Sequence, residues 1–99
     1  MFNTNGLLLN DKTIIELINS GLTKLSVSLD AHTERVYNKI RIGSNFKKVI
    51  KNINNFLRIR KKLKFKIPLL KVTFLKVAIN KNELKPFLKY WEEKADLIS

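Results

Sequence analysis

The 99-residue sequence contains no cysteine, three glycines, two prolines and one histidine. The absence of cysteine excludes a disulfide framework, thiolate zinc sites, cysteine-ligated iron–sulfur clusters and cysteine nucleophiles from this chain. The scarcity of glycine and proline beside a 44% hydrophobic fraction argues against a disordered, collagen-like or low-complexity chain. We therefore expect residues 1–99 to form a single domain-sized segment with a packed core.

Long hydrophobic runs are also missing. No uninterrupted apolar stretch approaches the roughly 20 residues that a membrane-spanning helix needs. The first ten residues, MFNTNGLLLN, lack the basic region followed by a hydrophobic region that is typical of a secretory signal. We expect a cytoplasmic protein without a membrane span.

Acidic residues are scarce: eight Asp and Glu stand against twenty Lys and Arg, which gives a net charge of +12. Such an excess generally attracts nucleic acids or anionic membranes. Most of the cations are lysine, however, and they accompany many Asn and Ile residues, a joint excess expected from A/T-rich coding. Phosphate and base recognition depend more on arginine, so the composition disfavours a dedicated nucleic-acid site.

The residue pattern predicts alternating helices and strands. Asn10 and Asp11 can cap a helix that ends before Gly21. The segment LTKLSVSLD, residues 22–30, alternates apolar and polar side chains with the two-residue period of a strand. Further helices are predicted over 33–40, 45–63 and 83–94, a long buried strand over 69–79, and parts of two more strands at 2–4 and 95–99.

Strands that are separated by helical crossovers of this length pair in parallel, which predicts an α/β architecture. Both ends of the chain fall within predicted strands, so the chain reads as an interior slice of a larger repeating βα domain. The expected partners are the remainder of that domain or a second copy of the chain, bound through the open sheet edges.

Polar residues on the strand over 22–30 suggest where ligands would bind. Ser26, Ser28 and Asp30 share a face that a sheet covered on both sides would fill with aliphatic side chains. A polar lumen in a curved, barrel-like sheet explains this alternation. For Asp30 the alternative is a local role in capping the next helix. Ligand-binding residues gather at the carboxyl ends of parallel strands, which here are residues 4–6, 28–30 and 76–80.

The order of these pieces resembles a known family. TNG, a helix, LSVSLDA, YNKIR, NFKKVIKNINNFL and a long strand follow one another as in the middle of the radical SAM enzymes. The similarity covers essentially the whole chain, from the end of the third strand to the start of the sixth in that family's partial (βα)6 barrel. It implies a partial parallel (βα) barrel fragment of about three βα units.

The resemblance implies cofactor-binding roles for Ser28, Asp30 and Arg41. Ser28 would contact the amino-acid or ribose part of S-adenosylmethionine. Arg41 would bind its carboxylate, which a guanidinium can grip with two parallel hydrogen bonds. The alternative for Arg41 is a surface ion pair with Glu34.

The resemblance also implies that Thr4, Lys71 and Thr73 line the substrate cavity, with Thr4 pointing into the lumen. The alternative for Lys71 is that its side chain merely extends to solvent at the strand entry. His32 has no second histidine or cysteine to complete a metal site, so we predict no metal-binding and no catalytic residue in this chain.

The departures from the family matter as much as the matches. The family holds a 4Fe–4S cluster on a CxxxCxxC loop and receives S-adenosylmethionine at a GGE-type segment, and both are absent here. We expect a fragment that supplies part of the S-adenosylmethionine and substrate wall of a parent enzyme, while this chain alone retains neither cofactor and is inactive. The alternative is a non-catalytic basic α/β module that binds RNA or a protein partner.

Overall fold

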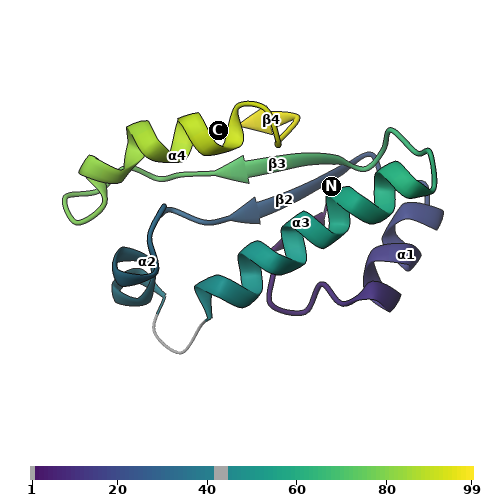
Figure 1. Cartoon of the computed structure of the whole chain (residues 1–99), viewed down its shortest axis with the longest axis horizontal. Coiled ribbons are helices and arrows are strands. Elements are labelled where there is room, and N and C mark those ends of the chain that lie inside the picture. The colour runs from purple at the N-terminus through teal and green to yellow at the C-terminus, as the bar shows by residue number, and fades with distance from the viewer. Residues whose placement is uncertain (1, 42–44) are drawn as a thin grey trace.

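The computed structural model describes residues 2–41 and 45–99. The elements follow the predicted order of alternating strands and helices (Figure 1). They are β1 (Phe2–Thr4), α1 (Asp11–Asn19), β2 (Lys24–Ser28), α2 (Glu34–Ile40), α3 (Phe46–Lys62), β3 (Leu69–Thr73), a 3-10 turn (Lys81–Glu83), α4 (Leu84–Trp91) and β4 (Leu97–Ile98).

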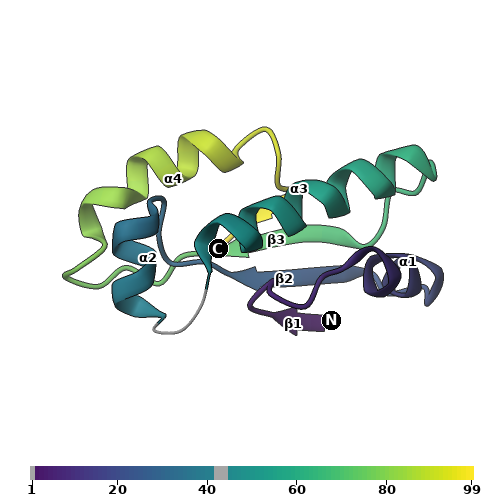
Figure 2. The same cartoon turned by 60° about the horizontal axis from the view of Figure 1, so that its bottom comes forward.

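The strands form a parallel sheet in the sequential order β1-β2-β3-β4. Parallel crossovers are right-handed, so a sequential order brings the connecting helices to the same face of the sheet. Figure 2 shows α3 and α4 over one side of β2 and β3, and α1 packs beside α3. This arrangement confirms the predicted fold class, an α/β fold consistent with a partial βα barrel fragment.

The core lies between the sheet and these helices. Leu25 and Val27 of β2, and Leu70 and Val72 of β3, have no exposed surface. They alternate with the half-buried or polar residues of the same strands, as a sheet covered on one face requires. The helices complete the core with large buried side chains, among them Ile14, Ile18, Val49, Ile53, Phe56, Phe87 and Trp91.

The cap predicted at Asn10 is confirmed, and Asn45, the residue at which a helix was predicted to begin, also caps its helix. The side chain of Asn10 accepts a hydrogen bond from the Thr13 N–H at 2.9 Å, and that of Asn45 accepts one from the Lys48 N–H at 3.1 Å. Pro86 lies in the first turn of α4, where a backbone N–H would have no partner within the helix.

The strand predicted over residues 69–79 is shorter than expected, and that prediction is wrong at its carboxyl end. β3 stops at Thr73, and Leu75, Val77 and Ile79 are 72%, 45% and 49% exposed. The alternating pattern continues past Thr73, but the backbone there bonds to loop side chains instead of a neighbouring strand. Leu63, which the sequence predicts as the last residue of the helix over 45–63, is instead the C-cap of α3 and is 41% exposed.

Within residues 2–41 and 45–99, no helix combines the length and the apolarity that crossing a bilayer requires.

Two glycines with positive φ provide a test of the packing between the β1–α1 turn and α3. Gly6 has φ 86°, and an added Cβ would lie 2.9 Å from Val49 Cγ1, whereas at Gly21, with φ 79°, an added Cβ meets nothing within 4 Å. We expect Gly6→Ala to lower the free energy of unfolding by about 2–4 kcal/mol through strain and overpacking. Gly21→Ala should cost only about 1 kcal/mol through strain. Urea unfolding measures both, and equal losses would contradict this packing.

Candidate functional site

The face of the sheet that points away from the helices carries a polar row. Asn3, Ser26, Lys71 and Leu97 are consecutive lateral partners across β1, β2, β3 and β4. Laterally paired residues of a parallel sheet project to the same face, and Leu25 and Val27 occupy the helix-facing side. Three of the four side chains in this row are therefore polar and lie opposite the core.

Ser28 and Thr73 form the next row toward the carboxyl end of the sheet, since they are Cα partners. Beside them lies an open hollow of about 410 Å³. It is lined by Ser28, Asp30, Thr73, Phe74, Leu75 and Ser99. The structure thus brings together three of the residues predicted for the site, Ser28, Asp30 and Thr73, and places Lys71 one row further from the hollow on the same face.

Asp30 lies just beyond the carboxyl end of β2 and bonds to the end of β3 and the loop after it. It has φ 61°, and its backbone N–H donates to the Thr73 carbonyl at 3.2 Å. One carboxylate oxygen accepts from the Leu75 N–H at 2.7 Å, and the other accepts from Arg41 Nη2 at 3.1 Å. Asp30 therefore ties the end of β2 to the loop after β3. It does not cap the next helix, as the alternative to ligand binding expected, because the N-cap of α2 is Thr33.

Arg41 pairs with Asp30 and not with Glu34, which corrects the partner expected for a surface ion pair. The two side chains are 27% and 16% exposed. Arg41 Nε is buried and makes no hydrogen bond to any part of the chain that the structure describes. The guanidinium is therefore held at the rim of the site by one carboxylate and retains donor capacity that Asp30 does not use.

Thr4 lies elsewhere than predicted. Its Cα partner on β2 is Val27, which belongs to the helix-facing side of the sheet, so Thr4 does not point to the open face. Its hydroxyl accepts a hydrogen bond from the Gly6 N–H at 3.0 Å and closes the turn after β1. Asn3, which the sequence reasoning did not select, occupies the open-face position. Adjacent residues of a strand point to opposite faces, so a register between β1 and β2 that differed by one residue would have put Thr4 on the open face.

Asn80 is fully buried and was also missed by the sequence reasoning. Its amide nitrogen donates to the Asp30 carbonyl at 2.8 Å and to the Leu75 carbonyl at 2.9 Å, and its oxygen accepts from the Val77 N–H at 2.7 Å. The only signal for it in the sequence is a polar residue directly after an apolar run. Asn80 holds the loops after β2 and β3 in one arrangement.

Glu83 makes a second link between the same two loops. Its carboxylate accepts hydrogen bonds from the His32 N–H at 2.9 Å, from the Thr33 N–H at 2.8 Å and from the Thr33 hydroxyl at 3.0 Å. Partial burial acts to raise the pKa of Glu83, but these bonds together outweigh it, and the pKa is lowered below its usual 4.5. The ionised carboxylate caps the start of α2 from a distant part of the chain.

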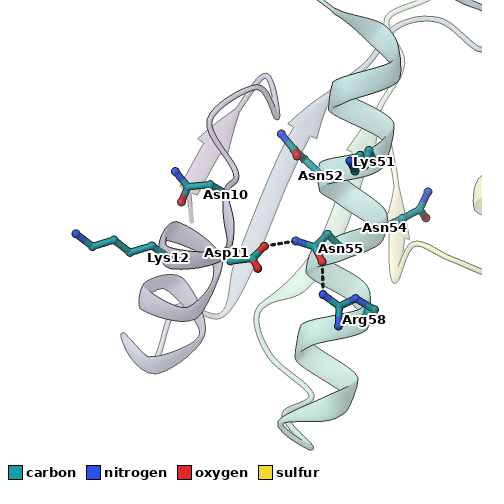
Figure 3. Close-up of a pocket in the computed structure, with 8 residues that line it drawn as sticks. All are labelled: Asn10, Asp11, Lys12, Lys51, Asn52, Asn54, Asn55 and Arg58. Atoms are coloured by element: carbon teal, nitrogen blue, oxygen red, sulfur yellow. Dashed lines mark hydrogen bonds between the residues drawn. The ribbon is translucent and has the colours of Figure 1, made fainter.

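A larger hollow of about 840 Å³ lies between α1 and α3, on the outer surface of the helices (Figure 3). Asn55 donates a hydrogen bond to Asp11, and Arg58 donates one to Asn55. Asn52 donates to the carbonyls of Gly6 and Leu7 and so supports the turn after β1. These polar side chains are bound to one another or to the backbone, and no residue predicted for the site lines this hollow.

The residues present do not fit an iron–sulfur cluster. The sequence contains no cysteine, and the part of the chain that the structure describes holds no group of three or more His, Asp or Glu side chains that could bind a metal ion. No reaction step through a cluster follows from this chain.

Comparison with known proteins gives one informative similarity. The chain is 34% identical over 87 residues to a probable GTP 3′,8-cyclase of Methanococcus maripaludis (strain C5 / ATCC BAA-1333). The match covers 88% of this chain but only 27% of that protein, so the chain spans about a quarter of its relative's length. No family model matches the sequence, and no solved structure matches the fold. The similarity supports the resemblance to the radical SAM superfamily and no finer assignment.

The bonds to Glu83 predict a pH-dependent contribution to stability. Because its pKa is lowered in the folded chain, the contribution is complete above the unfolded value near 4.5 and disappears as the pH falls through the folded pKa. Glu83→Gln should lower the free energy of unfolding by about 1 kcal/mol at pH 7, the value of a helix cap. The difference from the native chain should shrink toward pH 3 in urea unfolding. Glu93→Gln, at an exposed position, is the control; an equal loss in both variants would refute the capping role.

Proposed function

We propose that this chain is a fragment of a radical SAM enzyme that supplies part of the wall binding S-adenosylmethionine and substrate. The observation that carries the proposal is the one-sided sheet, whose face opposite the helices carries the partly exposed side chains of Ser28, Lys71 and Thr73 and the buried Ser26. Side chains that line a barrel of helix-covered strands face a lumen, and ligands bind at the carboxyl ends of its strands. The identity of 34% to a probable GTP 3′,8-cyclase supports the same family.

In this proposal Ser28 and Arg41 contact the cofactor, and Asp30 positions Arg41. The Ser28 hydroxyl lies at the hollow, where it can exchange hydrogen bonds with a ribose or an amino group. The Arg41 side chain is 27% exposed and is bound to Asp30, which lines the hollow although Arg41 itself does not; its terminal donors outside the Asp30 contact suit a carboxylate. S-adenosylmethionine, when bound in a complete enzyme, supplies the adenosyl group that is released by reduction. Lys71 and Thr73 remain our proposed substrate contacts.

The proposed partner is the remainder of a barrel. Within the described residues, β1 and β4 each pair with one neighbour and leave their outer edges free. Such edges are templates for pairing with further strands. A complete barrel would also cover Leu97, which is 39% exposed on the open face. The name of the relative assigns GTP as the substrate of that protein, and our proposal for this chain extends only to the wall.

The isolated chain is not expected to retain S-adenosylmethionine, but the cofactor added in excess should bind it weakly and at one place. Amide NMR signals of residues 28, 30, 73–75 and 99 should shift on titration, because these residues border the hollow. Arg41→Ala should weaken the interaction by about tenfold through loss of a charge-assisted hydrogen bond, and Arg41→Lys should restore part of it. Arg58→Ala, on the outer surface of α3, should have no effect.

The same titration distinguishes the alternative module. Shifts confined to the lysine-rich face of α3, or equal affinities for the Arg41 and Arg58 variants, would contradict the cofactor wall. An RNA oligonucleotide that shifts the α3 face with strong salt dependence, while S-adenosylmethionine shifts nothing, would favour the basic binding module instead.

A further inference from the structure

The end of α3 and its connection to β3 form an exposed segment that is rich in lysine. Its residues 61–67, Lys-Lys-Leu-Lys-Phe-Lys-Ile, are all exposed, and we call them the basic turn. Leu63, Phe65 and Ile67 are 41%, 43% and 37% exposed. No acidic residue occurs in the sequence between Glu34 and Glu83. Lysines and large apolar side chains therefore alternate on one exposed segment.

The basic turn has a defined backbone structure. The N–H of Lys64 donates to the Lys61 carbonyl at 3.0 Å, and the N–H of Phe65 donates to the Arg60 carbonyl at 3.0 Å. These are the paired bonds of a Schellman motif, whose left-handed position is usually glycine. Here that position is Lys64, with φ 62°. A cation thus occupies the place where glycine would be least strained.

The neighbouring acids leave the lysines of the turn largely uncompensated. Asp96 is engaged by Arg60 Nη1 at 2.7 Å and by the Leu70 N–H at 2.7 Å. Glu93 borders the hollow beside Phe65 and Lys66, but Lys94 borders it too. No ion pair of Lys61, Lys62, Lys64 or Lys66 occurs within the described residues. The turn therefore has a net positive charge.

The basic turn lies at the opposite end of the sheet from the candidate site. In Figure 1 the arrowheads of β2 and β3 point to the left, toward α2 and the start of α4. The connection from α3 to β3 lies at the right of the picture, beyond the tail of the β3 arrow. A surface bound there would leave the hollow at Ser28 and Asp30 accessible. The feature is thus independent of the proposed cofactor wall.

We propose that the basic turn binds the surface of an anionic lipid bilayer. Lysines near such a surface are attracted by its negative potential, and exposed Leu, Phe and Ile side chains can enter the boundary between headgroups and acyl chains. A site for RNA would favour arginine forks and stacked aromatic rings. The turn instead offers lysines with two aliphatic side chains and one aromatic ring, which RNA contacts would leave exposed to water.

The test is co-sedimentation of the full chain with phosphatidylcholine vesicles that contain or lack phosphatidylglycerol. The chain should bind only the anionic vesicles, less so at high salt. Lys64→Gly removes one charge, and its partition coefficient should fall about fivefold, the contribution of one lysine near an anionic surface. Because glycine relieves the left-handed backbone, the thermal midpoint of this variant should rise, so weaker binding cannot reflect unfolding.

Matched control variants distinguish binding by the basic turn from binding that depends only on the net charge or on any exposed apolar side chain. Lys47→Gln removes one charge from the exposed first turn of α3 and should change binding less than about twofold. Phe65→Ser should weaken binding at least about threefold, whereas Leu8→Ser, at a side chain 80% exposed elsewhere, should not. Equal losses for Lys64→Gly and Lys47→Gln would overturn the proposal. So would binding to single-stranded RNA, weakened by Lys64→Gly, without binding to vesicles.

Discussion

The handedness of parallel crossovers is the constraint on which the rest of this structure depends. Strands in the order β1-β2-β3-β4 place their connecting helices on one side, so one face of the sheet forms the core and the other does not. This explains why the apolar Leu25 and Val27 alternate on one strand with the polar Ser26 and Ser28, of which Ser26 is 6% exposed and Ser28 is half-buried. A strand inside a doubly covered sheet would be apolar on both faces.

The same constraint gathers the loops after β2 and β3 at one end of the sheet, where a polar network holds them. Asp30, Asn80 and Glu83 each bond to backbone groups of a loop other than their own. Each of these bonds joins residues at least 45 positions apart in the chain. The network fixes Arg41 through Asp30, which itself lines the open hollow.

The sequence predicts those features that depend on local chemistry. Side-chain periodicity located β2 and the helices, and Asn10 was recognisable as a cap because its partner lies three residues away. Local patterns could not predict to which face of the sheet Thr4 points, because that depends on the register between β1 and β2. The end of β3 was misplaced because Leu75 to Ile79 alternate like a strand, whereas their path follows from hydrogen bonds to the distant Asp30 and to the adjacent Asn80.

The central claim is that the open face at Ser28 borders a ligand site. Since the chain has no native cysteine, a single Ser28→Cys introduces one thiol whose labelling rate reports on that place alone. The claim predicts that a maleimide labels this thiol much faster than the thiol of Ala31→Cys, a position 1% exposed, and that S-adenosylmethionine slows the faster reaction. A rate equal to that of the buried position, or one that saturating S-adenosylmethionine leaves unchanged, would contradict it.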